Sequence, residues 1–84
     1  MYKGKLEKID KIKNQELQNN TAASNTFEGM FIRLPEEGES FMLVNKELEI
    51  IIKTSKVQNI IEIDWDYYIF ITLNSKYKLT YELI

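Results

Sequence analysis

Two groups of carboxylates come nearest to residues that could do chemistry. They are Glu36, Glu37 and Glu39 in one stretch, and Glu62, Asp64 and Asp66 in another. Neighbouring carboxylates can bind a cation or share acid and base roles. Neither group has the alternating ligands, bend glycine and closing carboxylate of a calcium loop. We interpret both as charged turns or strand edges that discourage aggregation, and we expect no metal site.

The amino-acid inventory excludes most other catalysis. Histidine and cysteine are both absent. The chain therefore has no Ser-His-Asp or Cys-His arrangement, no typical zinc ligands and no disulfide framework. A chain of 84 residues also has few residues with which to form a substrate cleft around a carboxylate pair. We expect a protein that is not an enzyme, with no catalytic residues and no cofactor.

The strongest candidate for binding is the stretch Asp64, Trp65, Asp66 and Tyr67. Trp and Tyr dominate the energetics of protein interfaces, so this stretch predicts binding to a protein partner, with Trp65 as the anchor if its ring is solvent-accessible. The sequence does not decide whether Trp65 is core or surface, and packing in the core or at its rim is the favoured use of the aromatic group around it. A second functional hypothesis is a nucleic-acid or nucleotide-binding barrel, in which aromatic rings stack on bases. The flanking carboxylates make it the weaker hypothesis.

A second candidate is a small polar pocket made by Thr54, Ser55, Asn74 and Ser75. These residues would meet if their strands were neighbours. The alternative interpretation is two separate hydrogen-bonded turns, and it is favoured at Asn74, which tolerates the left-handed backbone region and caps its own turn.

The strands that position these residues are predicted from the alternation of apolar and polar side chains, which has a period of two residues. In residues 27–34, one face holds Phe27, Gly29, Phe31 and Arg33. A five-residue hairpin loop at 35–39 should join this strand to 41–44, with Gly38 able to take a positive φ. The chain turns again at 45–47.

The second half of the chain predicts three strands. The first alternates clearly from Val57 onward, with Val57, Asn59, Ile61, Ile63 and Trp65 on one face, and residues 64–66 then reverse the chain. Residues 67–73 are apolar throughout and predict a strand buried on both faces. The last strand should turn four side chains to the core: Tyr77, Leu79, Tyr81 and Leu83.

These signals predict one all-β domain over residues 1–84, an antiparallel meander of about six strands. A sheet of this size closes into a small barrel, SH3-like or OB-like, because closure removes exposed edges. Residues 2–12 fit a strand or a helix, with the strand favoured because everything after it is β. Nine of the thirteen residues at 14–26 are Asn, Gln, Ser or Thr, which predicts a polar loop.

Charge and hydropathy indicate the surroundings of the protein. Residues 1–13 hold five lysines and two acidic residues, a net +3, and the remaining residues carry net −5. This basic end is too short and too mixed with acid to resemble a DNA-binding face. No apolar run is long enough to cross a bilayer, so we expect a cytoplasmic protein without a membrane partner. Homo-oligomers are compatible with so small a core.

Three short motifs carry a resemblance: LPEEGESF at 34–41, TSKV at 54–57 and TLNSKY at 72–77. With their P-x-x-G-x-x-F, T-S-x-V and T-x-N-S-x-Y patterns, residues 27–84 resemble small uncharacterised β-rich proteins of bacteria, phages and mobile elements. The resemblance implies a small β protein, and it carries no activity or site. We expect a protein-interaction module encoded by a phage or mobile element.

Overall fold

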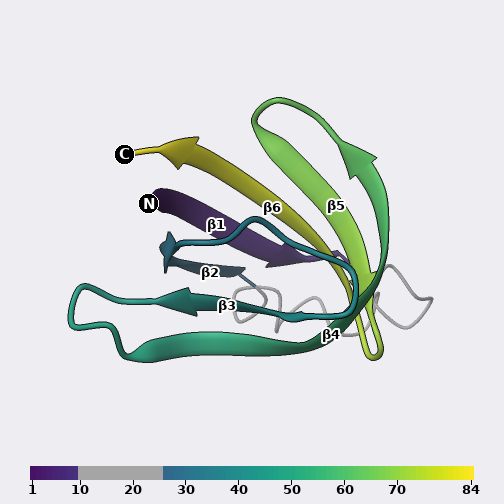
Figure 1. Cartoon of the computed structure of the whole chain (residues 1–84), viewed down its shortest axis with the longest axis horizontal. Helices are drawn as coiled ribbons and strands as arrows, with labels where there is room; N and C mark the ends of the chain where they lie inside the picture. The colour runs from purple at the N-terminus through teal and green to yellow at the C-terminus, as the bar shows by residue number, and fades with distance from the viewer. Residues whose placement is uncertain (10–25) are drawn as a thin grey trace, which may run out of the picture.

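The protein is a six-stranded antiparallel β-barrel, seen in a computed structural model that describes residues 1–9 and 26–84. Its strands are β1 (Tyr2–Lys8), β2 (Thr26–Phe31), β3 (Ser40–Val44), β4 (Ile50–Ile63), β5 (Tyr67–Thr72) and β6 (Lys76–Leu83). Each strand pairs with the next along the chain, and β1 pairs with β6 to close the barrel (Figure 1). The predicted all-β meander of six strands closing into a small barrel is confirmed.

The N-terminal segment, for which the sequence left helix and strand open, is strand β1. It lies between β2 and β6, and Ile84 N donates to Met1 O at 3.1 Å where the two chain ends meet. The polar loop predicted at 14–26 lies outside the described residues, except for Thr26, which begins β2. In residues 1–9 and 26–84 there is no helix that could span a membrane.

The core is a compact cluster of aliphatic and aromatic side chains inside the barrel. Its buried members are Leu6, Phe31, Phe41, Leu43, Val57, Phe70, Tyr77 and Leu79. The alternation predicted for the last strand is confirmed at three positions, because Tyr77 and Leu79 are buried and Tyr81 packs against the core. It is wrong at Leu83, which is 72% exposed as the last residue of β6, at the end of the barrel wall.

Strand β4 does not keep the strict alternation that the sequence predicted. Its pairing with β5 shifts register between Val57 and Asn59, and again between Ile60 and Glu62. Each shift adds an unpaired residue that reverses the faces of the strand. Val57 is therefore buried and Ile60 packs against the core, whereas Ile61, predicted to share the face of Val57, is 48% exposed.

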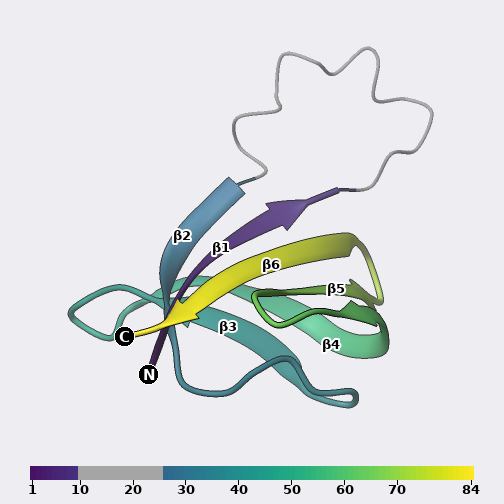
Figure 2. The ribbon, with the colours of Figure 1, turned by 90° about the horizontal axis from the view of Figure 1, so that it is seen from above.

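The hairpin predicted around residues 35–39 is wrong in its pairing. Strands β2 and β3 share one residue pair, Met30 with Val44, and the chain leaves β2 in a wide connection (Figure 2). Gly29, the residue before Met30, allows β2 to approach β3 closely, because a Cβ at this position would lie 2.8 Å from Val44 O. Gly38 takes the expected positive φ, 92°, and its N–H donates to Val57 O on β4 at 2.8 Å.

Strand β5 was predicted to be buried on both faces, and only its inner face is. Phe70 and Thr72 are 0% and 3% exposed inside the barrel. On the outer face, Ile69 and Ile71 are only half-buried. The apolar residues of this face therefore do not belong to the core of the barrel.

Candidate functional site: the Trp65 turn and its groove

The turn between β4 and β5 holds Trp65 out from the barrel. Asp64 N donates to Tyr67 O at 2.8 Å, and Trp65 N donates to the Asp64 side-chain Oδ1 at 2.8 Å. Tyr81 N donates to Asp66 O at 3.0 Å, which ties the turn to β6. Trp65 is 87% exposed, the largest fraction among the exposed hydrophobic residues of the described chain. The question of core or surface is thus answered: a well-anchored backbone presents a free indole.

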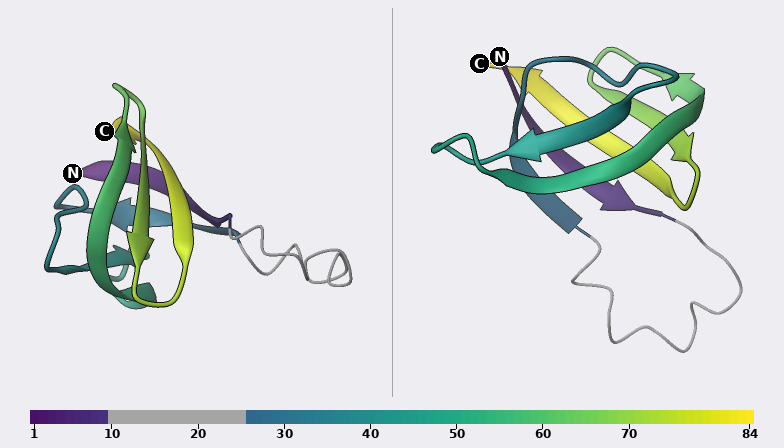
Figure 3. Two further views of the ribbon diagram at one scale, coloured as in Figure 1. Left: turned by 90° about the vertical axis from the view of Figure 1, so that its right-hand side faces the viewer. Right: turned by 60° about the horizontal axis from the view of Figure 1, so that its bottom comes forward.

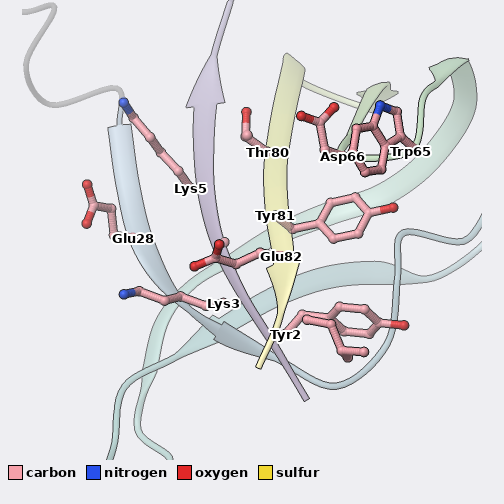
Figure 4. A pocket seen from close by; sticks show the side chains of 11 residues that line it. Tyr2, Lys3, Lys5, Glu28, Trp65, Asp66, Thr80, Tyr81 and Glu82 are labelled. Atoms are coloured by element: carbon pink, nitrogen blue, oxygen red, sulfur yellow. The ribbon is translucent and has the colours of Figure 1, made fainter.

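A groove of about 690 Å³ runs along β6 beside this turn. Its lining comes from β1, β2, β6 and the turn: Tyr2, Lys3, Gly4, Lys5, Glu28, Trp65, Asp66, Thr80, Tyr81, Glu82 and Leu83. Figure 4 shows the rings of Trp65, Tyr81 and Tyr2 on one side of β6, and the charged side chains from β1 and β2 on the other. Two residues of the predicted binding stretch, Trp65 and Asp66, line the groove. Their chain neighbours Asp64 and Tyr67 do not line it.

The charges of the groove are mixed. Lys3 and Lys5 project from β1, where their register partners on β6 are Glu82 and Thr80. Glu28, from β2, and Asp66, from the turn, complete the charged lining with Glu82. The lining thus holds three carboxylates and two ammonium groups, and Asp64 and Asp66 are the chain neighbours of Trp65.

Tyrosine rings support the aromatic side of the groove. Tyr81 lies edge-on to Tyr2, with ring centroids 5.6 Å apart, and is 5.8 Å from Tyr68. Tyr2 in turn stacks on the buried Phe31 at 5.0 Å. Burial raises the pKa of Tyr81, with further contributions from Tyr68, Tyr2 and Asp66. The Tyr81 hydroxyl is therefore neutral at physiological pH, and the rings form a continuous packed layer down to the core.

Tyr67 faces outward and makes a small polar network of its own. Its hydroxyl donates to Glu62 Oε2 at 2.5 Å, and Lys78 Nζ lies 4.9 Å from the centre of its ring. The hydrogen bond to the Glu62 carboxylate is the main reason why the pKa of Tyr67 is raised to about 12. Tyr67 thus serves to link β4, β5 and β6 on the outer surface.

The predicted polar pocket divides into two local arrangements. Thr54 lies inside strand β4, at an irregularity in the pairing with β3, where its Oγ1 accepts a hydrogen bond from Phe41 N at 3.0 Å. Ser75 belongs to the β5–β6 turn, where Ser75 N and Asn74 N donate to Thr72 Oγ1 at 3.2 and 3.3 Å. No hydrogen bond between the two pairs occurs in the described residues. The hairpin turn expected at Asn74 is confirmed, but Thr72 rather than Asn74 caps it, and Asn74 does not take a positive φ.

One atom of that predicted pocket is unusual. Ser55 Oγ is buried and has no hydrogen-bond partner in the described part of the chain. Its neighbour Thr54 donates its hydroxyl hydrogen to Ser55 O at 2.7 Å. The backbone carbonyl of Ser55 therefore accepts a hydrogen bond, whereas its side-chain hydroxyl makes none in the described residues. A polar pocket at Ser55 stays a prediction.

The two acidic groups are spread over the surface as separate side chains. Glu37 Oε2 accepts a hydrogen bond from Ile60 N at 3.1 Å, which fastens the 32–39 connection to β4. Asp64 caps its own turn, and Glu62 binds Tyr67. Among residues 1–9 and 26–84, no group of three or more acidic residues is arranged to hold a metal ion.

A second cavity, of about 360 Å³, lies under the 32–39 connection where it passes β3. Its lining includes apolar residues such as Leu34 and Phe41 and the charged residues Glu36, Glu39 and Arg33. The cavity exists because the chain leaves β2 immediately after its one pair with β3. It is well separated along the chain from the Trp65 turn.

Sequence reasoning missed the residues that the barrel closure adds to the groove. Lys3, Lys5 and Thr80 gave no local signal, because their neighbourhood depends on the pairing of β1 with β6. A pairing of the first strand with the last is not encoded in any single window of sequence. No protein-family model matches the chain, and no curated protein or solved structure is significantly similar to it. A function must therefore be argued from this geometry.

Proposed function

We propose that the protein is a non-catalytic protein-interaction module that binds its partner through Asp64, Trp65, Asp66 and Tyr67 and the adjoining groove. The observation that carries the proposal is the 87% exposure of Trp65 on a turn whose backbone is hydrogen-bonded on both sides. Exposing an indole to water is unfavourable, and a turn whose backbone is already hydrogen-bonded loses little backbone entropy when a partner binds. Such rings are typical anchors of protein interfaces.

The charges around the indole define the kind of partner. Asp64 and Asp66 flank it, and three carboxylates outnumber two lysines in the groove. A partner surface with a hydrophobic cleft for the indole and basic residues around it would complement this face, since charge complementarity directs association and excludes wrong partners. We also propose, from the motif resemblance and the composition, that the protein acts in the cytoplasm of a bacterium and is encoded by a phage or mobile element.

A second candidate function is the binding of a nucleic acid or nucleotide. It is favoured by one observation: Lys3 and Lys5 line the same groove as Trp65 and Tyr81. Aromatic rings that share a groove with basic residues suit stacked bases and phosphates. The three carboxylates of the groove weigh against it, because they repel a phosphate backbone.

Affinity capture from the host with three baits tests the proposal. The baits are the wild-type protein, Trp65→Ala and Leu48→Ala, the last being a matched removal of an apolar side chain that is 67% exposed in the β3–β4 turn. The expected result is a protein retained by the wild type and by Leu48→Ala and lost with Trp65→Ala, while circular dichroism shows all three folded. Equal retention by all three baits would contradict the proposed site.

A salt titration distinguishes the two candidate functions. Phosphate contacts release counterions, so a single-stranded oligonucleotide bound at about 50 mM salt should dissociate by about 200 mM. Tight binding of this kind would favour the second candidate. Binding of a protein partner with little change over the same range would support the first.

A further inference from the structure

The outer face of β5 is apolar where its neighbours are polar. Beyond the barrel wall, β6 presents Lys76, Lys78, Thr80 and Glu82, the polar alternation expected of a sheet that faces water. The outward residues of β5 and its flanks form what we call the β5 strip: Ile61, Tyr67, Ile69, Ile71 and Leu73. Ile61 and Leu73 are 48% and 68% exposed. Figure 3 shows β4, β5 and β6 side by side on this side of the molecule.

The register of the three strands sets a row of charges across this strip. Glu62 on β4 pairs with Ile69 on β5, and Ile69 pairs with Lys78 on β6. The row therefore reads acid, apolar, base. The Glu62 carboxylate is exposed, and its binding of the Tyr67 hydroxyl through Oε2 leaves further acceptor positions open.

We propose that the β5 strip is the interface of a homodimer, covered by the same strip of a second copy of the chain. A two-fold axis parallel to β5 lays Ile69 against its counterpart and brings Lys78 of each copy over Glu62 of the other. A two-fold axis perpendicular to the strand would instead oppose Lys78 to Lys78 and Glu62 to Glu62. The row thus selects one isologous arrangement, in which both charge pairs are satisfied at once.

The size of the strip sets the strength of the association. Three neighbouring strands span about 10 Å from the first to the third, and a barrel wall is convex, so the contact is a band along β5. Small interfaces of this kind belong to weak complexes. The mass of the protein in solution should therefore rise with concentration, from the 10.0 kDa of the single chain toward twice that value. This interface shares Tyr67 with the proposed partner-binding stretch but does not include Trp65, so Trp65→Ala should leave it intact.

Sedimentation of charge-swap variants between about 1 µM and 1 mM tests the proposal. Glu62→Lys and Lys78→Glu should each remain monomeric where the wild type is dimeric, because like charges then face each other. An equimolar mixture of the two should recover the dimer mass, since every contact in the mixed pair joins a lysine to a glutamate. The double variant Glu62→Lys/Lys78→Glu should dimerise by itself.

Matched controls are Glu47→Lys and Lys46→Glu in the β3–β4 turn, which make the same changes of charge on exposed residues away from the strip. Both should dimerise as the wild type does. Circular dichroism of each variant checks that it is folded. If a single charge swap impairs folding, the double variant still tests the interface, because it keeps one acid and one base in the row. A wild type that is monomeric throughout, or a mixture of single variants that stays monomeric, would overturn the proposal.

Discussion

The hydroxyl oxygen of Thr54 accepts a hydrogen bond from the backbone N–H of Phe41 at 3.0 Å. Both residues are buried, and the pair lies where the register between β3 and β4 shifts between Ser40 and Met42. A register shift removes a ladder partner from one strand, and a buried N–H without a partner is costly. The hydroxyl oxygen of Thr54 therefore replaces a backbone carbonyl as the acceptor for Phe41 N–H.

Replacing this hydroxyl should destabilise the barrel. Thr54→Val keeps the shape of the side chain but leaves Phe41 N–H unpaired, so the free energy of unfolding should fall by about 1–3 kcal/mol. Thr54→Ser, which keeps the oxygen, should lose under about 1 kcal/mol. Urea denaturation of the three proteins measures both values. If Val and Ser variants are equally stable, the hydrogen bond does not support the fold.

The face assignment of β6 can be checked by adjacent truncations. Leu79 is fully buried, and Leu79→Ala should lower the free energy of unfolding by about 2–4 kcal/mol through the lost burial and the cavity left behind. Thr80, the next residue, is exposed, and Thr80→Ala should cost under about 0.5 kcal/mol. Equal losses in thermal or urea unfolding would show that the register of β6 is wrong.

The hydrogen bond from Tyr67 to Glu62 predicts a dependence of stability on alkaline pH. The neutral hydroxyl is the donor, so the pKa of Tyr67 is raised in the folded protein from 10.0 to about 12. A group with a raised folded pKa stabilises the protein fully below its unfolded pKa and loses that effect as pH rises through the folded pKa. The contribution of Tyr67 should thus be constant up to pH 10 and decline between 10 and about 12.

The comparison of wild type with Tyr67→Phe isolates this effect from the other titrating groups. The stability difference between the two proteins should be steady below pH 10 and shrink above it. Absorbance titration of tyrosinate should show that the variant lacks one of the late-ionising tyrosines. A stability difference that does not change across this range would mean that the hydrogen bond is absent in solution.

Much of the fold follows from the period-two pattern of the sequence. The alternation at Tyr77, Leu79 and Tyr81 predicted their inward face correctly, since half-buried strands must place every second residue in the core. The same pattern failed in β4, because a bulge adds a residue without any composition signal. After Val57, the next core residue is Ile60, a spacing of three that an alternating pattern cannot represent.

The binding face was only partly accessible to sequence reasoning. The composition Asp-Trp-Asp-Tyr marked the turn, but whether Trp65 was core or surface depended on which way a three-residue reversal turned its middle residue. The groove was invisible, because Lys3 and Tyr81 lie at opposite ends of the chain and meet only through the closure of β1 on β6. Long-range pairing is set by the fit of the whole barrel, which no short motif contains.

The fluorescence of Trp65 tests the central proposal most directly, because it is the only tryptophan of the chain and reports on the proposed site alone. The measurement is a titration of the folded protein with the purified partner obtained by affinity capture, followed by emission and acrylamide quenching. Since the indole is 87% exposed in the free protein, binding at this face should shift its emission to shorter wavelength and markedly reduce quenching. A partner that binds, by an independent titration, while the emission and quenching of Trp65 stay unchanged would contradict the account.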